Sequence, residues 1–232
     1  MPPTDRFVIS FAAEPPQQEL AAGRWAEALR EQFLAACADI DADGEEIGAA
    51  GEVRWFPDRS LYGRTYVPAV ARTELGYEFF GYVSFSVDAA GEPEEFEARA
   101  DFTGDVAEAN PDWELDLNEM VLGDWRGEAG ERAEMTLVWG VPLVAGGAVV
   151  TAELADHAVD QCGLHDQRFT LIAPDNYRGD YLEVKLWSRL GEQLAAESLY
   201  AEEDELDDGP DDDGTGEDGP DDGGAGQSDE DA

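Results

Sequence analysis

Apolar and polar residues alternate along three stretches between residues 77 and 118, and this alternation decides the fold class. In residues 77–87, 95–105 and 112–118 the apolar side chains fall on one side of an extended chain and most charged ones on the other. A period of two is that of a β-strand with one buried face. The spacers between the stretches are turn-like and too short for the crossovers that parallel strands need. The pattern therefore predicts a mostly antiparallel, meander-like β-sheet.

Seven further segments have the composition of strands. A first strand is expected at residues 6–13. The other six lie between turn signals and favour residues that are common in sheets. They cover residues 52–56, 64–73, 132–139, 148–154, 168–173 and 181–187. A short helix near residues 189–200 is expected to end the domain.

One long helix is predicted for residues 16–40. Its apolar residues recur at steps of three and four and form one stripe, made of Trp25, Leu29, Phe33, Ala36, Cys37 and Ile40. Pro15 and Pro16 suit its start, because an early proline gives up only an amide that has no helical partner. The fold class predicted from these patterns is α+β: one domain over residues 1–200, with the sheet packed on this N-terminal helix.

Residues 201–232 differ from the rest of the chain. They carry 16 acidic residues and no basic one, and Leu206 is their only large apolar residue. Such a segment cannot bury enough apolar surface to offset the entropy lost on ordering. We predict a disordered acidic C-terminal tail, which serves either solubility or the binding of a partner.

The surplus of acidic residues limits the partners open to the chain. There are 55 acidic and 14 basic residues in all, and residues 1–200 alone hold 39 acids against 14 bases. This charge repels nucleic-acid phosphates and anionic membrane surfaces and attracts basic proteins. We expect no direct nucleic-acid binding, no membrane association and, as a partner, a basic protein. Acidity that serves only solubility, or adaptation to a salty cytosol, would produce the same composition.

Cysteine content and hydropathy favour a cytoplasmic protein. Cys37 and Cys162 do not make the framework of a small secreted disulfide scaffold. Residues 7–13 are apolar but too few for a signal peptide. The longest weakly polar run, residues 137–150, is short and broken by proline and glycine, so it does not predict a membrane span.

Residues 39–44, DIDADG, match the first half of an EF-hand calcium loop. Such a loop takes side-chain oxygens from positions 1, 3 and 5, turns at a glycine at position 6 and uses the carbonyl of position 7. The corresponding candidate ligands are Asp39, Asp41, Asp43 and Glu45. The second half departs from the pattern, because position 12 is Ala50 instead of glutamate. The loop is either a calcium site or a plain acidic turn, and no other cofactor is expected.

Residues 156–166 hold both histidines of the chain and one cysteine, in the spacing H-x4-C-x2-H. Imidazole and thiolate are zinc ligands, but structural zinc takes four ligands and no second pair is evident. A polar hairpin that joins two strands is the favoured interpretation.

The chain lacks the GxSxG, GxxxxGK[ST], GxGxxG and HExxH motifs, so the sequence favours a protein without enzymatic activity.

Acidic side chains recur on the outward side of the predicted strands. Successive outward residues on a strand lie about 6.7 Å apart, from a rise near 3.3 Å per residue. Candidate partner-binding residues are therefore Glu95, Glu97, Asp112, Glu114 and Asp116.

The sequence favours an acidic interaction or regulatory protein that engages a basic partner. Two alternatives remain: a calcium-responsive binding protein that uses residues 39–52, and an enzyme whose site is not visible from the sequence.

Overall fold

The computed structural model describes residues 23, 25–126, 131–177 and 179–199, and the fold is described within them. They form one α-helix, α1 (Ala26–Ala38), a short 3-10 helix, η2 (Ala107–Ala109), and twelve strands. The strands are β1 (Val53–Trp55), β2 (Arg59–Leu61), β3 (Arg64–Arg72), β4 (Glu78–Val87), β5 (Pro93–Thr103), β6 (Leu115–Arg126), β7 (Arg132–Pro142), β8 (Gly147–Leu154), β9 (His157–Gly163), β10 (Phe169–Asp175), β11 (Leu182–Ser188) and β12 (Gln193–Ser198).

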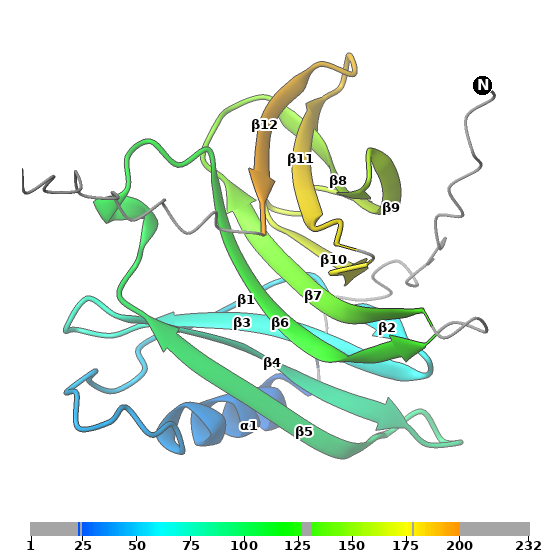
Figure 1. Cartoon of the computed structure of the whole chain (residues 1–232). Helices are drawn as coiled ribbons and strands as arrows, with labels where there is room; N and C mark the ends of the chain where they lie inside the picture. The colour runs from blue at the N-terminus through cyan, green and yellow to red at the C-terminus, as the bar shows by residue number, and fades with distance from the viewer. Residues whose placement is uncertain (1–22, 24, 127–130, 178, 200–232) are drawn as a thin grey trace, which may run out of the picture. The chain divides into compact units, whose positions relative to one another are not determined.

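The strands build three antiparallel sheets (Figure 1). Sheet A has the order β1-β3-β4-β5, with β2 also paired to β3. Sheet B has the order β10-β7-β6, and sheet C the order β12-β11-β8-β9. Every pairing between these strands is antiparallel, which confirms the predicted mostly antiparallel sheet structure. Only β2 to β5 follow one another as a meander, because sheets B and C combine hairpins with pairs of strands that are distant in sequence, β7 with β10 and β8 with β11.

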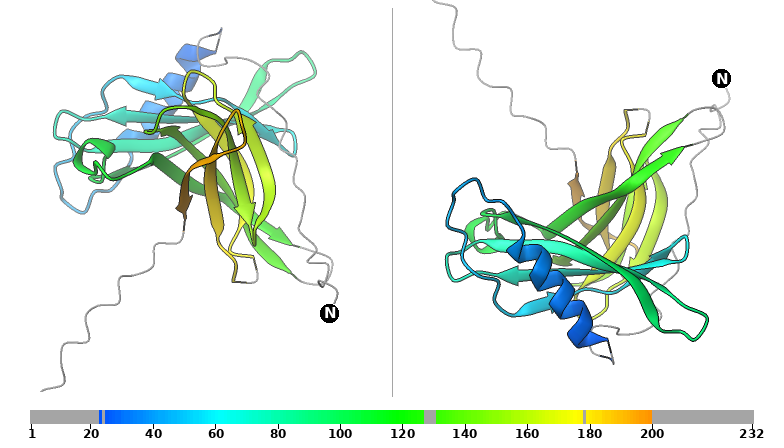
Figure 2. Two further views of the ribbon diagram at one scale, coloured as in Figure 1. Left: turned by 90° about the horizontal axis from the view of Figure 1, so that it is seen from above. Right: turned by 90° about the horizontal axis from the view of Figure 1, so that it is seen from below.

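The helix packs on sheet A, but α1 has 13 residues and is shorter than the predicted helix over residues 16–40. Its buried residues are Leu29, Phe33 and Cys37, spaced by four as the apolar stripe predicted, and they pack against Phe79, Val83 and Phe85 of β4. The helix ends before Asp39, where the aspartate-rich loop begins. Figure 2 shows α1 across the face of sheet A that is turned away from sheet B.

Sheet B lies between two apolar cores. On one side Leu137 and Trp139 pack against Val70 and Tyr82 of sheet A. On the other side Val138 joins a larger core that includes Val184 of sheet C. The residues of β7 thus alternate between two buried faces. This explains why its sequence is almost continuously apolar, since a strand covered on both faces needs no polar side.

Three local predictions were wrong. The segment near residues 189–200, predicted as a helix, contains strand β12, which pairs with β11. Residues 157–163, predicted as part of a hairpin turn, form strand β9, and the turn follows around residues 165–168. The predicted strand at residues 112–118 starts only at Leu115, because a turn closed by the Asn110 carbonyl and the Trp113 amide precedes it.

Several predictions concern residues outside the described part of the chain. The strand at residues 6–13, the beginning of the long helix and the acidic tail at residues 201–232 all belong to this group. Of the helices in the described residues, none is long and apolar enough to cross a membrane.

Candidate interaction surface

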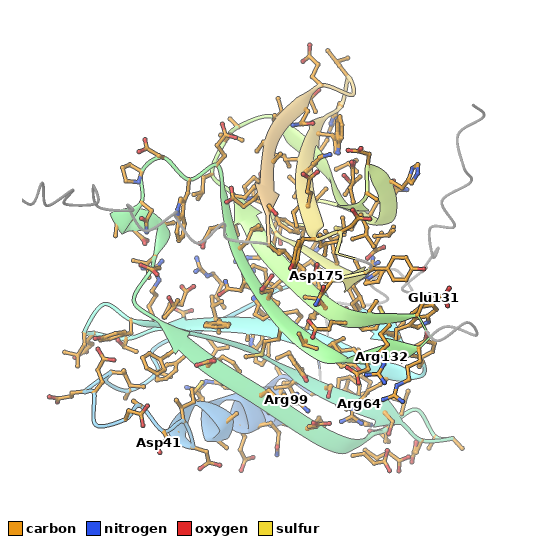
Figure 3. The ribbon with its side chains drawn as sticks, viewed as in Figure 1. Asp41, Arg64, Arg99, Glu131, Arg132 and Asp175 are labelled. Carbon is orange, nitrogen blue, oxygen red and sulfur yellow. The ribbon has the colours of Figure 1, made fainter. Side chains whose placement is uncertain are left out.

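Exposed acidic side chains gather at the end of sheet A where α1 finishes. We call this surface the acidic end. Its exposed acids come from the loop after α1, from the β3–β4 turn and from the residues after β5: Asp39, Asp41, Asp43, Glu45, Glu46, Glu74 and Asp105. None of them forms an ion pair with a basic side chain in the described residues. Figure 3 shows Asp41 beside the end of the helix.

The segments of the acidic end are held together by specific contacts around Tyr77. The Tyr77 hydroxyl donates a hydrogen bond to the Glu45 carboxylate, and its ring meets Phe102 edge to face with centroids 5.9 Å apart. Gly48 lies against Thr73 and Leu75. Three segments that are far apart in sequence therefore present their carboxylates on one surface. Leu75, which is 53% exposed, adds an apolar side chain to it.

Most basic side chains in the described part of the chain are already paired elsewhere. Glu78 is buried and accepts from Arg72 at 2.6 Å and from Arg54 at 3.3 Å, while Arg72 also reaches Glu108 at 2.7 Å. On sheet C the only lysine, Lys185, contacts two glutamates at 2.8 and 2.9 Å. These pairs neutralise the carboxylates between and within the sheets. The carboxylates of the acidic end have no basic partner of this kind among the described residues.

The predicted partner-binding residues of β5 are exposed but partly neutralised. Glu97 accepts from Arg64 at 3.4 Å and from Arg99 at 3.3 Å. Glu95 has a φ of 53° at a bulge in the β4–β5 pairing, and Ser86 Oγ lies 3.0 Å from its carboxylate. The bulge interrupts the regular 6.7 Å spacing that a row of outward residues would have.

Asp112, Glu114 and Asp116 do not lie in one row. Asp112 and Glu114 are exposed in the turn before β6, whereas Asp116 is half-buried on the strand. Burial raises the pKa of Asp116, and the charge of Glu78 adds to this effect, while Arg54 opposes it. Asp116 therefore belongs to the charged group around Glu78 and not to the outer surface.

The structure gives the DIDADG loop the geometry of a turn. Asp43 and Gly44 have positive φ angles of 52° and 88°, and the Asp43 amide donates to Asp41 Oδ1 at 3.2 Å. The Glu45 carboxylate is engaged by Tyr77. Among the described residues, no three His, Cys, Asp or Glu side chains are grouped so that they could hold a metal ion.

We expect calcium to leave the thermal midpoint of unfolding unchanged. A ligand that binds only the folded state at a hundredfold excess over its Kd stabilises that state by about 2.7 kcal/mol, which a thermal scan detects readily. The scan should be run with 5 mM calcium on the wild type and on Asp41→Ala. A rise in the midpoint that this variant loses would instead identify the loop as a calcium site.

A buried ion pair joins β2 of sheet A to β9 of sheet C. The Arg59 guanidinium contacts both carboxylate oxygens of Asp160 at 2.5 Å, and both side chains are almost completely buried. The backbone amides of Gln161 and Ile172 also donate to this carboxylate, at 2.8 and 2.9 Å. Sequence reasoning missed this pair, because nothing local relates two residues that are 101 positions apart.

Glu119 lies beside other carboxylates on the edge strand β6. Although its side chain is exposed, desolvation by the surrounding strands raises its pKa to about 7, and the charges of Asp175 and Glu134 add to the shift. Glu134 and Asp175 are cross-strand partners in the β7–β10 pairing. Figure 3 shows Asp175 between sheets B and C. The three side chains come from three strands, so no single stretch of sequence revealed them.

The raised pKa of Glu119 predicts a pH-dependent stability. Between pH 4.5 and about 7 the folded state binds more protons at this group than the unfolded state, so the free energy of unfolding falls as pH rises. We expect Glu119→Gln to melt at a higher temperature than the wild type at pH 8 and to lose part of the difference between pH 5 and pH 8. Thermal scans at both values check this, with Glu114→Gln as the control. Equal pH dependence in wild type and Glu119→Gln would contradict it.

The residues considered for a zinc site are not grouped as metal ligands in the described part of the chain. His157 and His165 are exposed, at the start of β9 and in the turn after it. Cys162 packs against the core of sheets B and C, and burial raises the pKa of its thiol to about 11. Burial likewise raises the pKa of Cys37 to about 12. Both thiols are therefore protonated at neutral pH and poor nucleophiles.

In comparisons with known proteins, no family model, no curated protein and no solved structure matches the chain.

Proposed function

We propose that this chain is a non-enzymatic protein of the cytoplasm that engages a basic partner protein through the acidic end. The observation that supports it is the gathering of unpaired acidic side chains at one end of sheet A. Arginine and lysine pair with carboxylates within and between the sheets, whereas seven exposed acids at one end lack an ion-pair partner among the described residues.

The chemistry of the acidic end suits a surface of lysine and arginine with an apolar side chain among them. Leu75 offers the apolar contact, and the surrounding carboxylates accept charge-assisted hydrogen bonds. Long-range attraction speeds the encounter of oppositely charged proteins, and short contacts then fix their orientation. Asp112, which is exposed in the turn before β6, could extend the same contact, whereas Glu95 and Glu97 lie toward the opposite end of sheet A, near the β4–β5 turn.

The test compares two variants that remove the same number of charges. The acidic-end variant carries Asp41→Asn, Asp43→Asn, Glu46→Gln and Glu74→Gln. The sheet C variant carries Asp156→Asn, Asp166→Asn, Glu192→Gln and Glu197→Gln, all at exposed positions. Asparagine tolerates the positive φ angles at residues 43, 156 and 166, so the turns should persist.

The immobilised proteins are exposed to an extract of the source cells at low salt. We expect the wild type and the sheet C variant to retain the same basic protein, and the acidic-end variant to lose it. Binding should weaken as salt rises toward 0.15 M, where the Debye length is about 8 Å. Equal loss in both variants would mean that only the overall charge matters and would overturn the assignment to the acidic end.

A further inference from the structure

A cluster of basic and aromatic side chains lies on the face of sheet A that is opposite α1. We call it the arginine–tyrosine cluster; it consists of Arg64 and Tyr66 of β3, Tyr82 of β4, and Glu97 and Arg99 of β5. Tyr82 is the cross-strand partner of Arg99, and Ser84 is the partner of both Tyr66 and Glu97. Directly opposed residues on one face of a sheet touch, so the five side chains form one group. Figure 3 shows Arg64 and Arg99 on this part of the sheet.

The two arginines are held in place but keep free donors. Arg64 donates from Nε to Ser84 Oγ at 2.9 Å and from Nη2 to the Glu95 carbonyl at 2.8 Å. Arg99 donates from Nη2 to Glu97 at 3.3 Å, and the described residues give its Nε and Nη1 no acceptor. Arg99 is 54% exposed, so these donors are open to a ligand.

The two tyrosines bring hydroxyl groups that lack an acceptor. Their rings meet edge to face with centroids 5.6 Å apart. Tyr82 is only 2% exposed as a residue, and neither its hydroxyl nor that of Tyr66 makes a hydrogen bond with a described residue. Neither hydroxyl is among the buried unpartnered atoms of the described residues, so both oxygens are reached by solvent and open to a ligand. Burial raises the pKa of both tyrosines, so both hydroxyls are protonated and can donate at neutral pH.

We propose that the arginine–tyrosine cluster binds the phosphate group of a small phosphorylated ligand. Phosphate suits a site with two guanidinium groups and two hydroxyl donors, because its three terminal oxygens accept more hydrogen bonds than the two of a carboxylate. Glu97 bridges the arginines in the free protein and is half exposed, so a phosphate can take its place. The ligand is small because the acidic body repels extended polyanions such as nucleic acids.

The probe is inorganic phosphate, titrated calorimetrically into the full chain at pH 7.5 and constant ionic strength. We expect binding with a Kd of roughly 1 mM for so small a probe. Arg99→Gln and Tyr82→Phe should each weaken it about tenfold, as expected for a lost hydrogen bond to a charged group. Tyr82→Phe keeps the packed ring, so its thermal midpoint should match that of the wild type. Arg132→Gln removes an exposed arginine from β7, outside the cluster, and should bind like the wild type.

The outcomes separate the site from general attraction to arginine. Absence of binding to the wild type, or equal weakening by Arg99→Gln and Arg132→Gln, overturns the proposal. Unchanged binding in a folded Tyr82→Phe and a folded Tyr66→Phe overturns the role of the hydroxyls and with it the site. Acetate is titrated in parallel, and binding of acetate as tight as that of phosphate overturns the assignment to a phosphate group. None of these results depends on the basic partner of the acidic end.

Discussion

Replacing Arg59 by methionine should lower the free energy of unfolding by about 3–5 kcal/mol, since breaking a buried ion pair leaves an uncompensated charge in the interior. Arg59 and Asp160 are 2% and 6% exposed, and the carboxylate accepts backbone hydrogen bonds from β9 and β10 as well. The pair thus ties β2 of sheet A to strands of sheets B and C. Urea unfolding followed by tryptophan fluorescence measures the loss.

Two controls show whether the loss comes from burial of the charge. Arg126→Met removes an arginine from an exposed pair, in which the Arg126 and Asp124 side chains are 66% and 64% exposed and 3.9 Å apart. Such a pair contributes about 0–1 kcal/mol, so this variant should stay close to the wild type. The double variant Arg59→Met/Asp160→Asn should recover part of the stability, because no unpaired charge remains. Equal effects of Arg59→Met and Arg126→Met would contradict the structural role of the buried pair.

Trp139→Ala should destabilise the protein by about 3–5 kcal/mol, the cost of emptying the space of a large buried side chain. Trp139 is completely buried between sheets A and B, where its ring lies 6.4 Å from that of Phe80. Its indole N–H has no hydrogen-bond partner in the described residues. Trp139→Phe should therefore cost much less, because it fills most of the space and removes an unpaired donor. Urea unfolding of both variants tests this, and equal losses would show that the packing at Trp139 is not as described.

The strand pattern was predictable because most strands carry their own signal. The predicted segments 64–73, 168–173 and 181–187 correspond to β3, β10 and β11 within a few residues. Alternation and β-rich composition are local properties, and burial against a neighbouring layer reinforces them. The antiparallel arrangement followed from the short spacers. The N-terminal strand and the acidic tail lie outside the described residues, and their predictions stand as made.

Strands whose form depends on distant partners were not predictable. The sequence of β12, QLAAES, consists mostly of residues that favour helices, and its pairing with β11 overrides that preference. Strand β9 was predicted as part of a turn because Gly163 and Asp166 are turn residues. Its buried Asp160 is satisfied only by distant groups, which include the Arg59 side chain and the Ile172 amide. The order of strands in sheet C also depends on contacts between distant parts of the chain. Strand β11 lies between β8 and β12, although β9 and β10 separate it from β8 in the sequence.

The candidate surface was predictable only in part. The loop at residues 39–45 was singled out from its spacing, and it does form part of the acidic end. Glu74 and Asp105 join it through contacts around Tyr77 that no local pattern reveals. Glu97 and Asp116 looked like outward acids, but Arg64, Arg99 and the charged group around Glu78 engage them. Charge compensation is a three-dimensional property, so the sequence could show the acidic surplus but not where it remains unpaired.

The rate at which the captured basic protein associates with the chain tests the proposed function most directly. It is measured by stopped flow from 0.01 to 0.15 M salt, where the Debye length falls from about 30 to about 8 Å. We expect the acidic-end variant to associate about tenfold more slowly than the wild type at the lowest salt, with a shallower dependence on salt. The sheet C variant, which has the same net charge, should stay within about twofold of the wild type. Indistinguishable rates for the two variants would contradict the assignment of partner binding to the acidic end.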